Sequence, residues 1–301
     1  MDATDLRVFE AVARLGGMNR AASELNTVQS NVTARVRRLE DQLGEALFER
    51  HSRGVRLTAA GERLLPYALR VDHLLEDARR AVADDGRPRG ALTLGSLETT
   101  AALRLSPILT AYAAAEPAVD LVLRTGTTEE LIESVLARRV EGAFVCGPVE
   151  HPALDGEVLF REELALATAP AVRTLDELAG RGDLKIVVLR AGCSYRQRLE
   201  AVLAQRGVVG LRQLEFGTIE SLIGCAAAGL GVTLLPRGIL EPARRAGRIA
   251  VHSLPAEDAL VDTLFIRRRD AFRSSALAAF LEVARGAASE PAGAVGYLYH
   301  R

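Results

Sequence analysis

The sequence predicts an α/β protein with an all-α N-terminal domain, and three patterns support this expectation. The first 60 residues contain three short amphipathic helices and a small hairpin. One long helix with a heptad pattern follows. From residue 90 onward, short apolar strands alternate with helices, which is typical of mainly parallel sheets. We therefore expect an N-terminal domain over 1–60, a linker helix over 58–86 and an α/β region over 90–301.

Composition limits the classes of protein that the chain can belong to. Its 301 residues include 38 basic and 39 acidic side chains, a net charge of −1. Any surface for nucleic acid must therefore be local. No apolar run approaches the roughly 20 residues that span a bilayer, and the acidic start resembles neither a signal nor a transit peptide. We expect a cytoplasmic protein without membrane contact.

Cysteines and histidines are few and widely spaced. The chain has 3 cysteines and 5 histidines, and their spacing matches neither a disulfide framework nor a metal site. No nucleophile elbow, phosphate-binding loop or pair of histidine and carboxylate at useful spacing is present. We therefore expect no metal, no cofactor and no enzymatic activity.

Capping residues divide the first 45 residues into three helices. We expect Thr4 to cap a helix that ends at Gly16, Asn19 to cap a short second helix, and Thr27 to cap a third that ends at Gly44. The third helix has one apolar stripe, formed by Val28, Val32, Val36, Leu39 and Leu43. Its other side is polar and basic.

Three helices followed by a basic hairpin over 48–57 form the pattern of a winged helix-turn-helix, whose second "recognition" helix enters the major groove. Glutamine can pair with adenine through two hydrogen bonds, hydroxyls contact bases or phosphates, and guanidinium groups match phosphate oxygens. The predicted DNA contacts are Gln29, Ser30, Asn31, Thr33 and Arg37 on the third helix, and Arg50, Arg53 and Arg56 on the hairpin. The alternative is that they are ordinary solvated residues of a small helical domain.

The long helix from Thr58 to about Asp85 has an apolar heptad seam that must be buried against something. It can pack on this chain's own domains or pair with a second copy of the chain. For the pairing we expect contacts from Leu64, Val71, Leu75 and Val82. Pro66 should kink the early turns or delay the start of the helix.

Two sets of alternating strands and helices predict a two-lobed α/β region. Lobe I covers about 90–161 and 266–301, and lobe II about 162–265, with crossing strands at 160–167 and 260–267. Free N–H groups at helix starts bind anions, so polar residues between strands and helices mark a ligand site. The predicted ligand contacts are Ser96, Thr99, Thr100, Thr127, Thr128, Cys193, Ser194, Arg196 and Thr218. Capping is the alternative role for each hydroxyl, and an ion pair with Glu200 is the alternative for Arg196.

Residues 21–25, 28–33 and 38–44 closely resemble the N-terminal signature of LysR-type transcriptional regulators, and 47–50, 54–58 and 60–61 continue it. The resemblance implies a dimeric or tetrameric, sequence-specific regulator that binds double-stranded DNA and works with RNA polymerase. It also implies a periplasmic-binding-protein-like effector domain, to which we assign a small anionic effector. Two positions depart from the family pattern: Ala34 replaces a longer polar side chain, and Gly142 replaces a common aspartate.

Two alternatives to an effector-controlled regulator remain open. Cys193 is expected at a helix start near Arg196 and Arg198, a place that favours thiolate. Its surroundings are similar to the peroxide-sensing branch of the family, which suggests a thiol-based redox-sensing regulator. No second cysteine follows within two helical turns, around Val202. The other alternative is a two-lobed ligand-binding protein without a DNA function, which the missing secretory signal disfavours.

Overall fold

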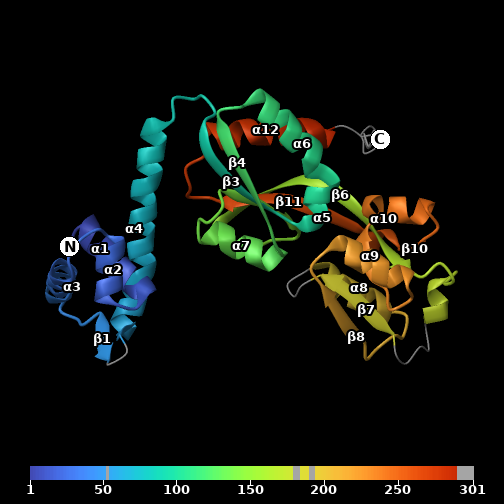
Figure 1. Ribbon diagram of the computed structural model, residues 1–301, viewed down its shortest axis with the longest axis horizontal. Helices are drawn as coiled ribbons and strands as arrows, with labels where there is room; N and C mark the ends of the chain where they lie inside the picture. Colours follow the sequence, from blue (N-terminus) through green and yellow to red (C-terminus); the bar gives the residue numbers. More distant parts are fainter. Residues whose placement is uncertain (52–53, 179–183, 190–193, 290–301) are drawn as a thin grey trace. The chain divides into compact units, whose positions relative to one another are not determined.

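The computed structural model describes residues 1–51, 54–178, 184–189 and 194–289 (Figure 1). The chain divides into two compact units, residues 1–85 and residues 86–301. The first unit is helical with one small hairpin. The second is a mixed α/β unit.

The first unit has the predicted order of three helices, a hairpin and a long helix. Its elements are α1 (Ala3–Leu15), α2 (Met18–Glu24), α3 (Gln29–Leu43), β1 (Phe48–His51), β2 (Gly54–Leu57) and α4 (Ala59–Ala83). Strands β1 and β2 are antiparallel, with Phe48 opposite Leu57. The buried core includes Phe9, Val12, Ala21, Val32, Val36, Leu39 and Leu47. The winged helix-turn-helix prediction is confirmed.

The helix starts differ from the expected caps. Asp2, not Thr4, caps α1, because its carboxylate accepts from the Asp5 amide at 2.8 Å while the Asp5 carboxylate accepts from the Asp2 amide at 3.2 Å. This reciprocal capping box satisfies two amides at once. Helix α2 follows Gly17 without a side-chain cap, so Asn19 lies inside it. Thr27 does not cap α3, because its hydroxyl accepts from the Asn31 side chain at 2.9 Å.

The apolar stripe of α3 is shorter than the sequence pattern suggests. Val32, Val36 and Leu39 are buried, but Val28 is 65% and Leu43 40% exposed. Val28 precedes the helix and has an extended backbone. Its side chain therefore does not follow the helical periodicity that places Val32 and Val36 in the core. Leu43 lies in the last turn, next to the C-cap Gly44.

Helix α4 starts at Ala59 and includes Pro66, so a delayed start is wrong. The Thr58 hydroxyl caps it by accepting from the Gly61 amide at 3.0 Å. Its first half packs on the core of the same unit, where Ala68 is buried and Leu64 and Val71 are partly buried. The apolar residues of its second half are exposed, with Leu74 at 67%, Leu75 at 39% and Val82 at 90%.

The second unit alternates strands and helices. Its first half comprises β3 (Gly90–Ser96), α5 (Glu98–Thr100), the π-helical turn η1 (Ala101–Leu105), α6 (Ser106–Ala115), β4 (Val119–Thr125), α7 (Thr128–Leu136), β5 (Gly142–Cys146) and β6 (Leu154–Thr168). Its second half comprises η2 (Leu175–Leu178), β7 (Lys185–Leu189), α8 (Ser194–Ala204), β8 (Arg212–Phe216), α9 (Ile219–Ala227), β9 (Thr233–Pro236), α10 (Arg237–Arg245), β10 (Ala250–Ser253), α11 (Ala256–Ala259), β11 (Leu260–Arg268) and α12 (Ser275–Ser289). Each strand expected from the sequence is present.

Strands β6 and β11 connect two groups of strands, as expected for the crossing strands. The largest sheet has the order β10-β6-β11-β5-β3-β4, and β9 also pairs with β6. The first part of β6 pairs with β11, and its last part pairs with β9 and β10. Strands β3, β4 and β5 are parallel to one another, and β7 is parallel to β8. The lobe boundaries near 161 and 265 stay a prediction.

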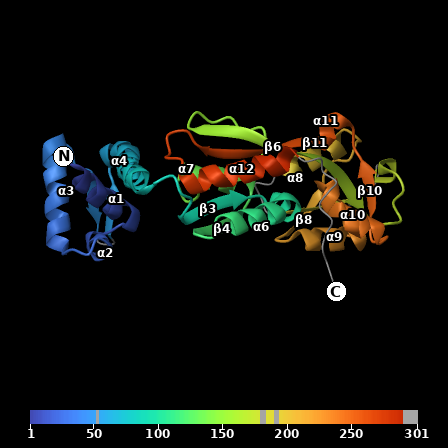
Figure 2. The ribbon, with the colours of Figure 1, turned by 90° about the horizontal axis from the view of Figure 1, so that it is seen from above.

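Helices α6 and α12 lie side by side next to strands β3 and β4 (Figures 1 and 2). The Tyr112 hydroxyl of α6 donates to the Ala276 carbonyl of α12 at 2.8 Å, and the Tyr112 and Phe280 rings meet edge to face. Helix α12 begins at Ser275. Helix α10 and strand β10 were not expected from the sequence.

Candidate nucleic-acid interface and ligand pocket

The polar face of α3 is exposed as a DNA-reading face requires. Gln29, Ser30, Asn31 and Arg37 are exposed, and Thr33 is half-buried. The buried Val32, Val36 and Leu39 fix the other side of the helix to α1 and α2. Packing alone therefore presents the predicted side chains to solvent on a rigid helix.

The hairpin is attached to the turn between α1 and α2 through one carbonyl. The Gly16 oxygen accepts from the Val55 amide at 3.3 Å and from the Arg20 guanidinium at 3.2 Å. Gly54 sits so close that a Cβ there would lie 2.6 Å from this oxygen. Arg56 is exposed on β2. Arg53 and the side chain of Arg50 lie outside the described part of the structure.

A buried carboxylate holds two arginines of α3. Asp5 is 1% exposed, and it binds Arg35 at 3.0 Å and Arg38. Asp2 lies 3.4 Å from the Arg38 guanidinium. Burial alone would raise the pKa of Asp5. The hydrogen bonds from Arg38, from the Asp2 amide and from Arg35 outweigh that effect and hold the pKa below its ordinary value of 3.8.

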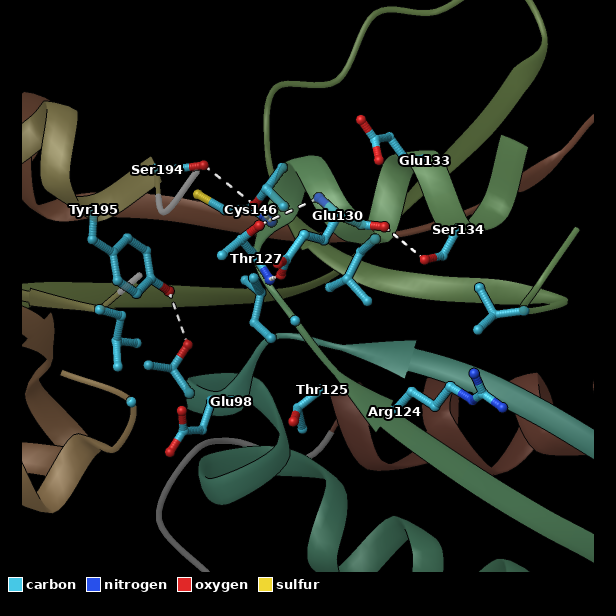
Figure 3. A pocket seen from close by; sticks show the side chains of 18 of the residues that line it. Glu98, Arg124, Thr125, Thr127, Glu130, Glu133, Ser134, Cys146, Ser194 and Tyr195 are labelled. Atoms are coloured by element: carbon cyan, nitrogen blue, oxygen red, sulfur yellow. Dashed lines mark hydrogen bonds between the residues drawn. The ribbon is translucent and has the colours of Figure 1, made fainter. Parts of the chain in front are cut away.

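The second unit contains a cavity of about 440 Å³ at the carboxyl ends of β4, β5, β7 and β8 (Figure 3). Ligands of parallel α/β sheets bind at such ends. Four of the predicted ligand contacts line it: Thr99, Thr127, Thr128 and Ser194. Segments on both sides of the crossing strands contribute to its wall.

Three polar contacts join the two sides of this cavity. The Ser194 hydroxyl donates to the Thr128 hydroxyl at 3.3 Å, and the Thr99 and Tyr195 hydroxyls lie 3.5 Å apart (Figure 3). The Glu98 carboxylate accepts from the Ile219 amide at the start of α9, at 3.4 Å. Through these contacts the wall of the cavity depends on how the two strand groups pack.

Among the described residues, four other predicted ligand contacts do not line the cavity: Ser96, Thr100, Arg196 and Thr218. The Ser96 hydroxyl donates to the Leu97 carbonyl at 2.9 Å, and Thr100 is buried. Arg196 pairs with Glu200 at 3.1 Å, which was its alternative role. Thr218 caps α9 by accepting from the Ser221 amide at 3.3 Å. Cys193 lies outside the described residues.

Charged and aromatic residues that the sequence analysis did not name also line the cavity. They are Glu98, Arg124, Glu130, Glu133, Arg139, Tyr195 and Phe216. Glu130 is already used by its own helix, since its carboxylate accepts from the Thr127 amide at 2.8 Å in a capping box. Arg124 is the next-to-last residue of β4, three positions before the expected Thr127, so its place near a strand end was the available signal.

Cysteines give no support to a redox centre in the described part of the chain. Cys146 is buried at the end of β5 and lines the cavity, and Cys225 is half-buried on α9. Within the described ranges no group of three metal-ligating side chains is close enough to hold an ion. No described helix has both the length and the apolar character needed to span a bilayer.

A winged helix-turn-helix on one unit and a ligand-sized cavity in an α/β unit define a ligand-responsive DNA-binding protein. The comparisons with known proteins place it more narrowly. Residues 3–62 match the bacterial regulatory helix-turn-helix protein model of the lysR family, and residues 85–289 match the LysR substrate binding domain. The chain belongs to the LysR family of transcriptional regulators, which are not enzymes.

Individual relatives agree with this assignment over nearly the whole chain. The HTH-type transcriptional regulator GltR of Bacillus subtilis is 42% identical over 276 residues, which cover 92% of this chain and 93% of that protein. The chain is therefore a DNA-binding transcriptional regulator with an effector-binding domain, and regulators of this family oligomerise.

Solved structures share the fold. ArgP from Mycobacterium tuberculosis is 21% identical, with a TM-score of 0.69 and coverage of 96% of this chain and 98% of that one. Full-length CbnR complexed with its target DNA is 24% identical, with a TM-score of 0.60 and coverage of 95% and 100%. The predicted two-part fold class is confirmed.

Proposed function

We propose that α3 lies in the major groove and reads base edges with Gln29, Ser30 and Thr33. Asn31 and Arg37 flank these contacts on the same helix. Phosphate contacts come from Arg50, Arg53 and Arg56 of the hairpin. The observation that carries the proposal is the exposed polar face of α3, opposite the buried Val32, Val36 and Leu39.

Paired substitutions separate base reading from phosphate contact. Gln29→Ala should reduce the binding free energy for the specific site by about 1–3 kcal/mol and change that for a scrambled duplex little. Arg56→Ala should weaken binding to both duplexes about equally. It should also reduce the magnitude of the slope of log affinity against log salt concentration by about 1. Fluorescence anisotropy with both duplexes across a salt series measures both effects. Equal losses on the two duplexes for Gln29→Ala would remove this residue as a base reader.

The cavity of the second unit is the proposed effector site, and the proposed effector is a small anion. Its volume of about 440 Å³ suits a metabolite-sized ligand. Arg124 and Arg139 supply positive charge, while the hydroxyls of Thr99, Thr128 and Ser194 supply hydrogen bonds. The three glutamates of the wall oppose an anion, so we place the anionic group toward the two arginines.

Calorimetry against a panel of small carboxylates, phosphates, sugars and amines tests the effector proposal. Anions should bind, and Arg124→Gln should weaken them about tenfold or more, because a charge-assisted hydrogen bond contributes on the order of 1.5–3 kcal/mol. Binding confined to uncharged or cationic compounds would contradict the anionic assignment.

The proposed effector acts by binding two arrangements of lobes I and II with different affinity.

A second copy of the chain is the proposed partner along α4, through Leu75 and Val82. Leu64 and Val71 belong to the same predicted seam, although both also pack on the core of their own unit. A symmetric dimer reads half-sites about 34–36 Å apart or multiples of that distance.

RNA polymerase is the proposed partner at the promoter. In vitro transcription with and without the regulator tests this proposal.

A further inference from the structure

The two acidic residues at the start of α1 neutralise part of the recognition helix. Arg35 donates to the Asp5 carboxylate at 3.0 Å, and Arg38 also binds this carboxylate. Asp2 adds a contact to Arg38 at 3.4 Å. Asp5 is 1% exposed, whereas the side chains of Arg35 and Arg38 are 30% and 50% exposed. The arginines therefore reach inward to a fixed buried charge.

The two arginines lie on the flank of α3 away from the proposed reading face. Arg38 comes nine residues after Gln29, about two and a half turns at 3.6 residues per turn. Arg35 comes two residues after Thr33, more than half a turn around the helix. A helix in the major groove has phosphates along both of its flanks, so a free arginine on this flank could bind the backbone.

The charge balance shows what the pairing does. Residues 27–56 contain six arginines and four acids, an excess of two positive charges. Asp2 and Asp5 offset that excess completely. We propose that Asp5 is a positioning residue for DNA binding, which holds Arg35 and Arg38 off the phosphates and so keeps affinity for non-specific duplex low. This proposal rests on the assignment of α3 as the DNA-reading helix.

Arginines that are held off the phosphates can be recognised from how the DNA affinity depends on salt concentration. Because log Kobs falls as log salt concentration rises, we take the salt slope as the magnitude of this decrease, to which each phosphate contact contributes about 0.9. Arg38→Gln in the otherwise unaltered chain should leave this slope unchanged. Asp5→Asn should raise it by about 0.9 for each released arginine, and should strengthen non-specific binding about threefold to tenfold. Arg38→Gln in the Asp5→Asn background should then lower the slope again.

The test uses the full chain and an arbitrary 30-base-pair duplex, chosen at about three helical turns, with circular dichroism to confirm that each variant is folded. Asp41→Asn is the matched control, because it removes the same charge from an exposed residue of α3. A decrease in slope of about 0.9 for Arg38→Gln alone, or equal slopes for Asp41→Asn and Asp5→Asn, would overturn the proposal. If the unaltered chain itself shows no salt-dependent affinity, the assignment of α3 fails and this inference fails with it.

Discussion

Asp5 links the ionisation of one carboxylate to the folding of the first unit. Its pKa is below the ordinary value of 3.8, because the hydrogen bonds from Arg38, the Asp2 amide and Arg35 exceed the cost of burial. A lowered pKa means that the unfolded chain binds the proton more tightly than the folded chain. The stabilisation is therefore complete above pH 3.8 and is lost as the pH falls through the folded value.

We predict that Asp5→Asn removes this acid sensitivity. At neutral pH the variant should be less stable by about 1–3 kcal/mol, because the two arginines lose a charged acceptor. The difference from the unaltered chain should shrink below pH 3.8. Urea unfolding at a series of pH values measures it. A difference that stays constant down to the lowest pH would show that the Asp5 charge does not stabilise the fold.

Gly61 allows α4 to contact the loop before the hairpin. A Cβ at this position would lie 2.3 Å from the Leu47 carbonyl oxygen. We predict that Gly61→Ala destabilises the first unit by about 1–3 kcal/mol through overpacking. Gly224→Ala on α9 is the control, since nothing lies within 4 Å of its Cβ position. That change should stabilise the helix by about 0.5–1 kcal/mol. A neutral Gly61→Ala variant in denaturant unfolding would contradict the predicted clash.

Single residues were predicted unevenly from the sequence. Asp2 and Thr4 are both good caps, and only the reciprocal contact with Asp5 decides between them. The hydroxyls Thr99, Thr127 and Thr128 were found because they lie between strand and helix. Tyr195 was missed, because its place in the wall depends on the packing of α8 against Thr99 and not on a local signal.

Helix α4 is divided between two environments. Its first half packs on the core of the first unit, and its second half exposes Leu75 and Val82. We predict that Leu75→Asp gives monomers with weakened operator binding and an unchanged fold. Leu64→Asp should instead destabilise the first unit, because Leu64 packs on its core. Light scattering and thermal unfolding distinguish the two effects, and a dimer that survives Leu75→Asp would argue against this seam.

Regular elements were predicted better than irregular ones. The apolar runs of β3, β5 and β7 are distinct in the sequence, and each is present. The crossing strands were expected from their position alone, and β6 begins at Leu154, before the expected residue 160. Helix α10 was missed because Pro242 lies inside it, which normally argues against a helix. Strand β10 has four residues, Ala250–Ser253, too few for an alternating pattern. Its existence depends on pairing with β6.

The chain as a whole combines a DNA-reading unit with a ligand-binding unit. The sequence was sufficient for this organisation because the first unit has amphipathic helices in succession, whereas the second alternates short apolar strands with helices. The chemistry of the effector was not accessible in the same way. Arg124, Glu98 and Glu133 come from separate segments, and their charges meet only in the folded cavity.

The most direct test of this account is the binding of the purified full chain to DNA upstream of its own coding region. Fluorescence anisotropy should show an affinity for that fragment that exceeds the affinity for a scrambled duplex. Both affinities should fall steeply as salt rises, because arginine contacts displace counterions from phosphates. If no double-stranded fragment shows salt-sensitive binding, α3 is not a DNA-reading helix in this protein.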